Sequence, residues 1–172
     1  MATPVPFPKC WWVTDHLLAG PVFFGGSLAA LLDHMHALEA AGIRTIVSLV
    51  GVHQFYPDED QGDAIAWEIV PRFSWHGFAL PDGAAPDNDT MRLILSWIDV
   101  GLRGGDKVYV HCLSGRGRTG TIIGCWLARH GVAQGQGVVT RLTELREAAG
   151  LPIPCPETDA QRALIMRWRK NQ

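Results

Sequence analysis

The chain has 172 residues, 47% of them hydrophobic, which is sufficient for one domain with a substantial core. Its 15 basic and 17 acidic residues give a net charge of −2, which excludes general electrostatic attraction to nucleic acid or to an anionic membrane. No apolar run reaches the roughly 18 residues of a membrane-spanning helix, so we expect a single soluble domain over residues 1–172.

The first half of the chain predicts several strands and one helix. We expect short strands over 11–13 and 17–20, a helix from 27 to about 41, a strand over 44–50, and short strands over 67–70 and 74–78. Ser27 is the expected N-cap of the helix, and Gly42 is its expected end. The segment 44–50 is apolar on both faces, which is typical of a strand covered by helices.

The second half of the chain alternates a strand with helices. We expect a helix over 90–102 with Asp89 as its N-cap, a strand over 107–111, and helices over 121–130, 134–149 and 162–169. This succession of strands and helices predicts an α/β fold with a mainly parallel central sheet flanked by helices.

The loop between the strand 107–111 and the helix 121–130 is suited to bind an anion. A loop of this kind directs unpaired N–H groups at one point, with the positive end of the helix dipole behind them. Its glycines allow the backbone to come close to a ligand of the size of a phosphate group. The residues expected around the phosphate are Leu113, Ser114, Gly115, Arg116, Gly117 and Arg118.

Two reactive side chains stand at the ends of this loop. The positive field of the helix N-terminus would favour the thiolate form of Cys112, which makes it a nucleophile. The planar guanidinium of Arg118 can hold two phosphoryl oxygens and offset the charge of the transition state. We expect Thr119 to donate to the sulfur of Cys112 when it leaves, and His111 to orient the loop through its ring nitrogens.

The run from His111 to Gly120 resembles the His-Cys-x5-Arg-Ser/Thr signature of the protein tyrosine phosphatase superfamily, in the form found in its dual-specificity branch. Residues 12–21 are also similar to the opening of bacterial and plant dual-specificity phosphatases. The resemblance implies hydrolysis of phosphotyrosine, with phosphoserine and phosphothreonine as further candidates, through a phosphocysteine intermediate and without a cofactor.

The chemistry also needs a general acid, because the leaving oxygen requires a proton. The resemblance implies an aspartate on a loop some thirty residues before the cysteine, and Asp82 lies thirty residues before Cys112. Pro81-Asp82-Gly83 would also form a simple turn, and Asp87 is an alternative acid.

The segment 156–161 resembles the glutamine-bearing segment of the same superfamily. By resemblance, Gln161 would position water against the phosphocysteine, although Glu157 stands where larger relatives have another glutamine. An equally supported interpretation is an N-terminal helix cap supplied by Thr158 or Glu157.

Other chemistry has less support in the sequence. The four cysteines and the pair His34 and His36 lack metal-ligand spacing, so we expect no metal and no cofactor. A required free thiolate fits a reducing, cytoplasmic location. The expected partner is a phosphorylated protein or a small phosphomonoester; the oligomeric state stays open. Three alternatives remain: a phosphate-binding module without activity, a phosphatase for phosphoinositides that uses Arg116, and a sulfur-transfer or arsenate-reducing enzyme.

Overall fold

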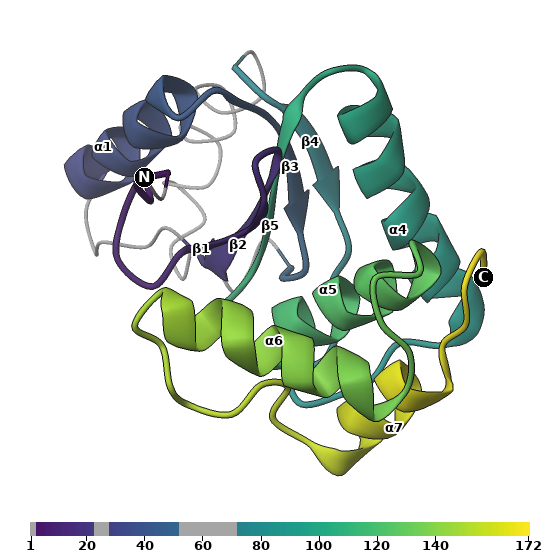
Figure 1. The fold of residues 1–172 in the computed structure, drawn as a ribbon. Coiled ribbons are helices and arrows are strands. Elements are labelled where there is room, and N and C mark those ends of the chain that lie inside the picture. Colours follow the sequence, from purple (N-terminus) through teal and green to yellow (C-terminus); the bar gives the residue numbers. More distant parts are fainter. Residues whose placement is uncertain (1–2, 23–27, 52–71) are drawn as a thin grey trace.

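The structure is a computed structural model that describes residues 3–22, 28–51 and 72–172 (Figure 1). In this part of the chain it has one five-stranded sheet, in the order β1-β2-β5-β3-β4. Only β1 and β2 pair in antiparallel fashion, and the other neighbours are parallel. The strands are β1 (Trp11–Thr14), β2 (Leu17–Pro21), β3 (Ile43–Ser48), β4 (Ser74–Gly77) and β5 (Lys107–Cys112). The predicted α/β fold with a mainly parallel sheet is confirmed.

Helices cover both faces of this sheet (Figure 1). They are α1 (Leu28–Ala40), α4 (Asn88–Arg103), α5 (Gly117–Arg129), α6 (Gln136–Ala148) and α7 (Asp159–Arg167). Helix α1 lies on one face, whereas α4 and α5 pack on the other, and α6 and α7 pack against α5. Among the described helices, none has the length and apolar character needed to cross a membrane.

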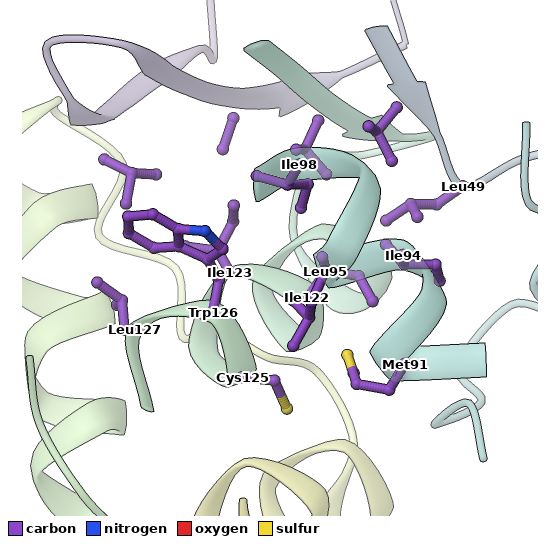
Figure 2. Close-up of a cluster of buried hydrophobic side chains, with 14 of the residues drawn as sticks. Leu49, Met91, Ile94, Leu95, Ile98, Ile122, Ile123, Cys125, Trp126 and Leu127 are labelled. Carbon is purple, nitrogen blue, oxygen red and sulfur yellow. The ribbon is translucent and has the colours of Figure 1, made fainter. Parts of the chain in front are cut away.

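Two clusters of buried side chains form the core, one on each face of the sheet. The larger cluster joins α4 to α5 and to the sheet, and Figure 2 shows Met91, Ile94, Leu95 and Ile98 beside Ile122, Ile123, Cys125, Trp126 and Leu127. Successive side chains of a strand point to opposite faces, so Val108 and Val110 join this cluster while Tyr109 joins the smaller one under α1. Burial of each large apolar side chain contributes about 1.5–3 kcal/mol, which holds β5 and α5 in fixed relation.

Helix α5 begins earlier than the sequence predicts. We expected it to start at residue 121, but α5 starts at Gly117. Its first turn is closed by a bond from Gly120 N to Arg116 O at 3.0 Å and by one from Thr121 Oγ1 to Gly117 O at 2.8 Å. The glycines in this turn have poor helix propensity, which hid the true start from sequence analysis.

The N-cap of α4 is also corrected. Asp87, not Asp89, caps this helix, because its carboxylate accepts from Thr90 N at 2.8 Å and from Thr90 Oγ1 at 3.0 Å. Asp89 lies in the first turn and pairs with Arg92 at 2.8 Å. The predicted helix over 162–169 likewise begins earlier, at Asp159, with Thr158 as its N-cap. The expected cap at Ser27 and the expected strand over 67–70 lie outside the described residues.

Candidate active site

Strand β5 and helix α5 place the predicted nucleophile and arginine on either side of a short loop. Cys112 is the last residue of β5 and Arg118 lies in the first turn of α5; each is only 1% exposed. The neighbouring strands hold the start of this loop, since Leu49 N donates to His111 O at 2.8 Å and Val22 N donates to Leu113 O at 3.2 Å. We call residues 112–118 the phosphate loop.

The middle of the phosphate loop requires a glycine. Gly115 has a φ of 69°, in the left-handed region, and a Cβ atom there would overlap the backbone of Gly20 and Pro21. Its carbonyl oxygen accepts a bond of 3.2 Å from Nη1 of Arg146, a buried arginine of α6. The guanidinium of Arg146 also lies 5.7 Å from the ring of Trp11. A buried cation therefore supports the phosphate loop from behind.

The N-terminus of α5 is suited to receive an anion. The first N–H groups of a helix have no partner within the helix, and they carry the positive end of its dipole. Arg116, at the N-cap, makes no side-chain capping bond within the described part of the chain. These donors begin directly after the loop that starts at Cys112, so an anion beside the thiol could satisfy them.

Arg118 connects the phosphate loop to the loop that carries the predicted acid. Its Nη2 atom lies 3.0 Å from Oδ1 of Asp82, and its Nη1 atom donates to Leu80 O at 2.9 Å. The Asp82 side chain is 73% exposed, whereas its partner is buried. The structure thus places Asp82 beside Arg118, at the end of the phosphate loop that begins at Cys112, with the carboxylate on the solvent side.

His111 and Thr119 are both completely buried beside the loop. Burial, helped by the charge of Arg118, lowers the pKa of His111 to about 3, although a hydrogen bond to the backbone of Cys112 opposes the shift. The His111 ring stacks on Tyr109 with centroids 5.5 Å apart. The Thr119 hydroxyl has no hydrogen-bond partner among the described residues, so it can donate to an atom that arrives at the site.

Arg116 is not a freely solvated charge. Its Nη2 atom forms an ion pair of 2.5 Å with Oε1 of Glu157, and both side chains are about one-third exposed, at 32% and 28%. Cys155 also holds this segment, since its Sγ donates to Arg116 O at 3.2 Å, and burial raises the pKa of that thiol to about 12. Glu157 therefore offsets much of the positive charge that Arg116 could offer to a ligand.

Gln161 lies in the first turn of α7 and is completely buried. Its Oε1 atom accepts from the backbone N–H groups of Glu157 and Thr158, both at 3.1 Å, and its own N–H donates to Thr158 Oγ1 at 3.3 Å. The predicted N-terminal cap at Thr158 is therefore confirmed. Gln161 Nε2 donates in addition to Ala84 O at 3.2 Å. Ala84 lies in the segment 80–86, which carries Asp82 and which we call the acid loop.

The sequence of the chain matches a protein family. Residues 22–132 match the family described as "Polymorphic toxin system, DSP-PTPase phosphatase", which covers most of the chain, including the phosphate loop and the acid loop. The chain belongs to this DSP-PTPase phosphatase family. It is thus a dual-specificity-like member of the protein tyrosine phosphatase superfamily, and the resemblance noted in the sequence is confirmed.

Similar proteins are found among sequences and solved structures. Protein 067L of Invertebrate iridescent virus 3, whose name describes a tyrosine phosphatase, is 29% identical over 116 residues. The match covers 64% of this chain and 44% of the viral protein. Dual specificity protein phosphatase CDC14B of Mus musculus is 36% identical over 58 residues, 34% of this chain and 11% of the mouse protein. The crystal structure of Tk-PTP in its active form has the same fold, with a TM-score of 0.70, 20% identity, and coverage of 92% of this chain and 95% of that one.

Sequence analysis missed Arg146 as a residue that contacts the phosphate loop, and it named Glu157 without its partner Arg116. One signal for Arg146 was present: Val138, Leu142 and Arg146 recur at helical spacing, which puts a charged residue on the apolar face of α6. A charge on such a face needs a buried partner, which here is a loop carbonyl. The pair of Arg116 and Glu157 left no local signal, because 41 residues separate them.

Proposed function

We propose that the chain hydrolyses phosphomonoesters through a phosphocysteine intermediate on Cys112, and that its substrates are proteins carrying phosphotyrosine. The observation that supports this proposal best is the contact of 3.0 Å between Arg118 and Asp82, six residues and thirty residues from Cys112 along the chain. A phosphate-binding arginine and a proton donor beside one thiol are the three groups that this hydrolysis requires.

In the first step, the thiolate of Cys112 attacks phosphorus and the bond to the leaving oxygen breaks. Arg118 and the loop N–H groups hold the phosphoryl oxygens and offset the charge that develops on them. A bound phosphate competes with Asp82 for Arg118, which frees the Asp82 carboxyl to face the leaving oxygen and donate its proton. The large exposure of Asp82 fits this role, because a leaving group must return to solvent.

In the second step, water attacks the phosphocysteine and the S–P bond breaks. Asp82, now a carboxylate, accepts the proton of the water, and inorganic phosphate is released. The Thr119 hydroxyl donates to the departing sulfur of Cys112. It is available for this bond because it has no other hydrogen-bond partner among the described residues. Cys112 is then a thiolate again, and the cycle consumes no cofactor.

Asp87 is a weaker candidate for the acid. Hydrogen bonds from Thr90, as the cap of α4, lower the pKa of Asp87, which keeps it deprotonated. A group held as a carboxylate is poorly suited to donate a proton. We therefore assign the proton transfer to Asp82.

Two further classes of substrate remain candidates. Phosphoserine and phosphothreonine are further candidates, as is a non-protein phosphomonoester such as a phosphoinositide. The pairing of Arg116 with Glu157 supports singly phosphorylated substrates, because it leaves less positive charge for a second phosphate. A reducing compartment such as the cytoplasm would keep Cys112 reduced, as the reaction requires.

Hydrolysis of para-nitrophenyl phosphate at pH 5–7, with EDTA and a reductant present, tests this proposal. We expect activity in the native chain and none in Cys112→Ser, which should still bind phosphate. Activity that Cys112→Ser retains, or that EDTA abolishes, would contradict the cysteine mechanism. If the native chain is inactive while orthovanadate still raises its Tm, the chain is a phosphate-binding module instead.

A further inference from the structure

We propose that Gln161 is a positioning residue that holds the acid loop against the phosphate loop, so that Asp82 is in place for proton transfer. This inference rests on the function proposed above. It assigns to the buried amide of Gln161 a role different from the placement of water, and it depends on contacts between α7 and the two residues that follow Asp82.

The acid loop is held from two sides. On one side, Arg118 binds Leu80 O at 2.9 Å and the Asp82 carboxylate at 3.0 Å. On the other side, Thr158 Oγ1 donates to Gly83 O at 3.0 Å. Gln161 Nε2 donates to Ala84 O at 3.2 Å, across 77 residues of chain. Two successive carbonyls of the loop are thus bound to the start of α7.

The amide of Gln161 also contacts the phosphate-loop side of the site. A Cβ atom built on Gly117, the first residue of α5, would lie 3.2 Å from Gln161 Nε2. The same nitrogen donates to the carbonyl of Ala84. The Nε2 atom of Gln161 therefore lies near Gly117 of the phosphate loop and bonds to Ala84 of the acid loop, and the side chain is completely buried.

The attachment of the acid loop to α7 matters because substrate competes with Asp82 for Arg118. When a phosphate dianion occupies Arg118, the ion pair with Asp82 weakens and the carboxyl is no longer held by that charge. Proton transfer needs the carboxyl within hydrogen-bond distance of the leaving oxygen, and a displacement of about 1 Å can cost up to ~100-fold in rate. The bonds to Gly83 and Ala84 do not involve Arg118, so they keep the loop closed during catalysis.

The two roles of Gln161 use different atoms and can be separated. Its Oε1 atom serves the cap of α7, whereas its Nε2 atom serves the acid loop. Gln161→Glu keeps acceptor oxygens for the cap, as in the common capping box, but it places a second oxygen against the carbonyl of Ala84. This variant should retain α7 and lose only the attachment of the acid loop.

The test compares kcat/KM for phenyl phosphate, which has a poor leaving group, with that for 2,4-dinitrophenyl phosphate, which hardly needs an acid. In Gln161→Glu we expect kcat/KM to fall by about 10–100-fold for phenyl phosphate and by less than about 3-fold for the dinitrophenyl ester. The double variant with Asp82→Asn should be no worse on phenyl phosphate than Asp82→Asn alone, because Gln161 acts through Asp82. Gln134→Glu, which changes an amide that donates to Ala128 O at 2.8 Å away from both loops, is the matched control and should behave as the native chain.

Equal losses on both esters, or a double variant whose losses multiply, would overturn the proposal and leave Gln161 a purely structural residue. If Gln161→Glu does not fold, Thr158→Asp replaces it, since an aspartate still caps α7 but cannot donate to Gly83 O. Its expected signature is the same loss on phenyl phosphate alone.

Hydrogen exchange separates this proposal from the function on which it rests. Amides in residues 80–86 should exchange faster in Gln161→Glu than in the native chain, while those of α7 should not change. A native chain without phosphatase activity would contradict the proposed function, yet this exchange would still support the attachment of the loop. Unchanged exchange in residues 80–86 would overturn the attachment itself.

Discussion

Arg146 in α6 donates a hydrogen bond of 3.2 Å to the carbonyl oxygen of Gly115 in the phosphate loop, 31 residues earlier in the chain. Burial lowers the pKa of Arg146, so the guanidinium has lost solvation, and its contacts with Gly115 and with the Trp11 ring offset part of that loss. The contact fixes the carbonyl of Gly115, in the middle of the phosphate loop, through a side chain of α6.

Replacement of Arg146 should weaken both the fold and phosphate binding. In Arg146→Met the Gly115 carbonyl loses its buried donor, which costs about 1–3 kcal/mol of the free energy of unfolding. We expect the Kd for phosphate, measured from the rise in Tm with concentration, to increase about 10-fold. Arg141→Met, on the exposed face of α6, is the control and should change neither value appreciably. A phosphate Kd equal to that of the native chain would contradict a role of Arg146 in shaping the loop.

Removal of the Glu157 charge should change substrate preference. Glu157→Gln frees Arg116 from its ion pair of 2.5 Å and exposes a positive charge at the edge of the site. We expect KM for a doubly phosphorylated peptide to fall about 3–10-fold relative to KM for the singly phosphorylated peptide. The gain should disappear in the double variant with Arg116→Met, and it should shrink at high salt. A ratio of KM values that does not move would show that Arg116 does not reach a second phosphate.

His111 should make stability depend on pH. Its pKa is lowered from 6.5 to about 3, mainly by burial, so between these values the unfolded chain binds a proton that the folded chain does not. The free energy of unfolding is therefore unaffected by this group above pH 6.5. It decreases as the pH falls from 6.5 toward 3, by up to about 1.4 kcal/mol per pH unit. Urea unfolding of the native chain and of His111→Gln between pH 4.5 and 7.5 measures the difference, in which the carboxylates common to both cancel. Parallel curves for the two proteins would show that His111 is not buried in its neutral form.

Alkylation should select Cys112 among the four cysteines. Burial raises the pKa of Cys10 and of Cys155 to about 12, and it raises that of Cys125 as well, so these three stay protonated and unreactive at pH 7. We expect iodoacetate to add once, at Cys112, and phosphate to slow the reaction; peptide mass spectrometry identifies the modified residue. Modification of Cys155 at a comparable rate would mean that the segment before α7 opens in solution.

The strand, loop and helix of the candidate site could be predicted because the residues that form them are neighbours in the sequence. Cys112, Gly115 and Arg118 lie within seven residues, between a β-branched strand and an apolar helix. Backbone geometry alone makes such a junction an anion site, so neither the rest of the fold nor a distant partner was needed. Asp82 was chosen as the acid because a known family has an aspartate at that separation from its cysteine. In the structure, Oδ1 of Asp82 lies 3.0 Å from Nη2 of Arg118.

The first residues of helices were harder to predict than the helices themselves. Asp87 and Asp89 are the same residue type, and both precede an apolar helix, so only the geometry at Thr90 distinguishes the cap. The first turn of α5 contains two glycines, whose poor propensity is outweighed by the packing of the helix against the sheet. Tertiary contacts thus moved the ends of helices whose existence was already clear from periodicity.

Neighbouring residues alone were enough to predict the α/β fold, the phosphate loop and the cysteine that we propose as the nucleophile. The tertiary structure was needed to identify the groups that support the two loops: Arg146 behind Gly115, Glu157 beside Arg116, and Gln161 against Ala84. These pairs are separated by 31, 41 and 77 residues. They exist because α6 and α7 pack against α5, and a periodic pattern records that a face is buried but not which partner buries it.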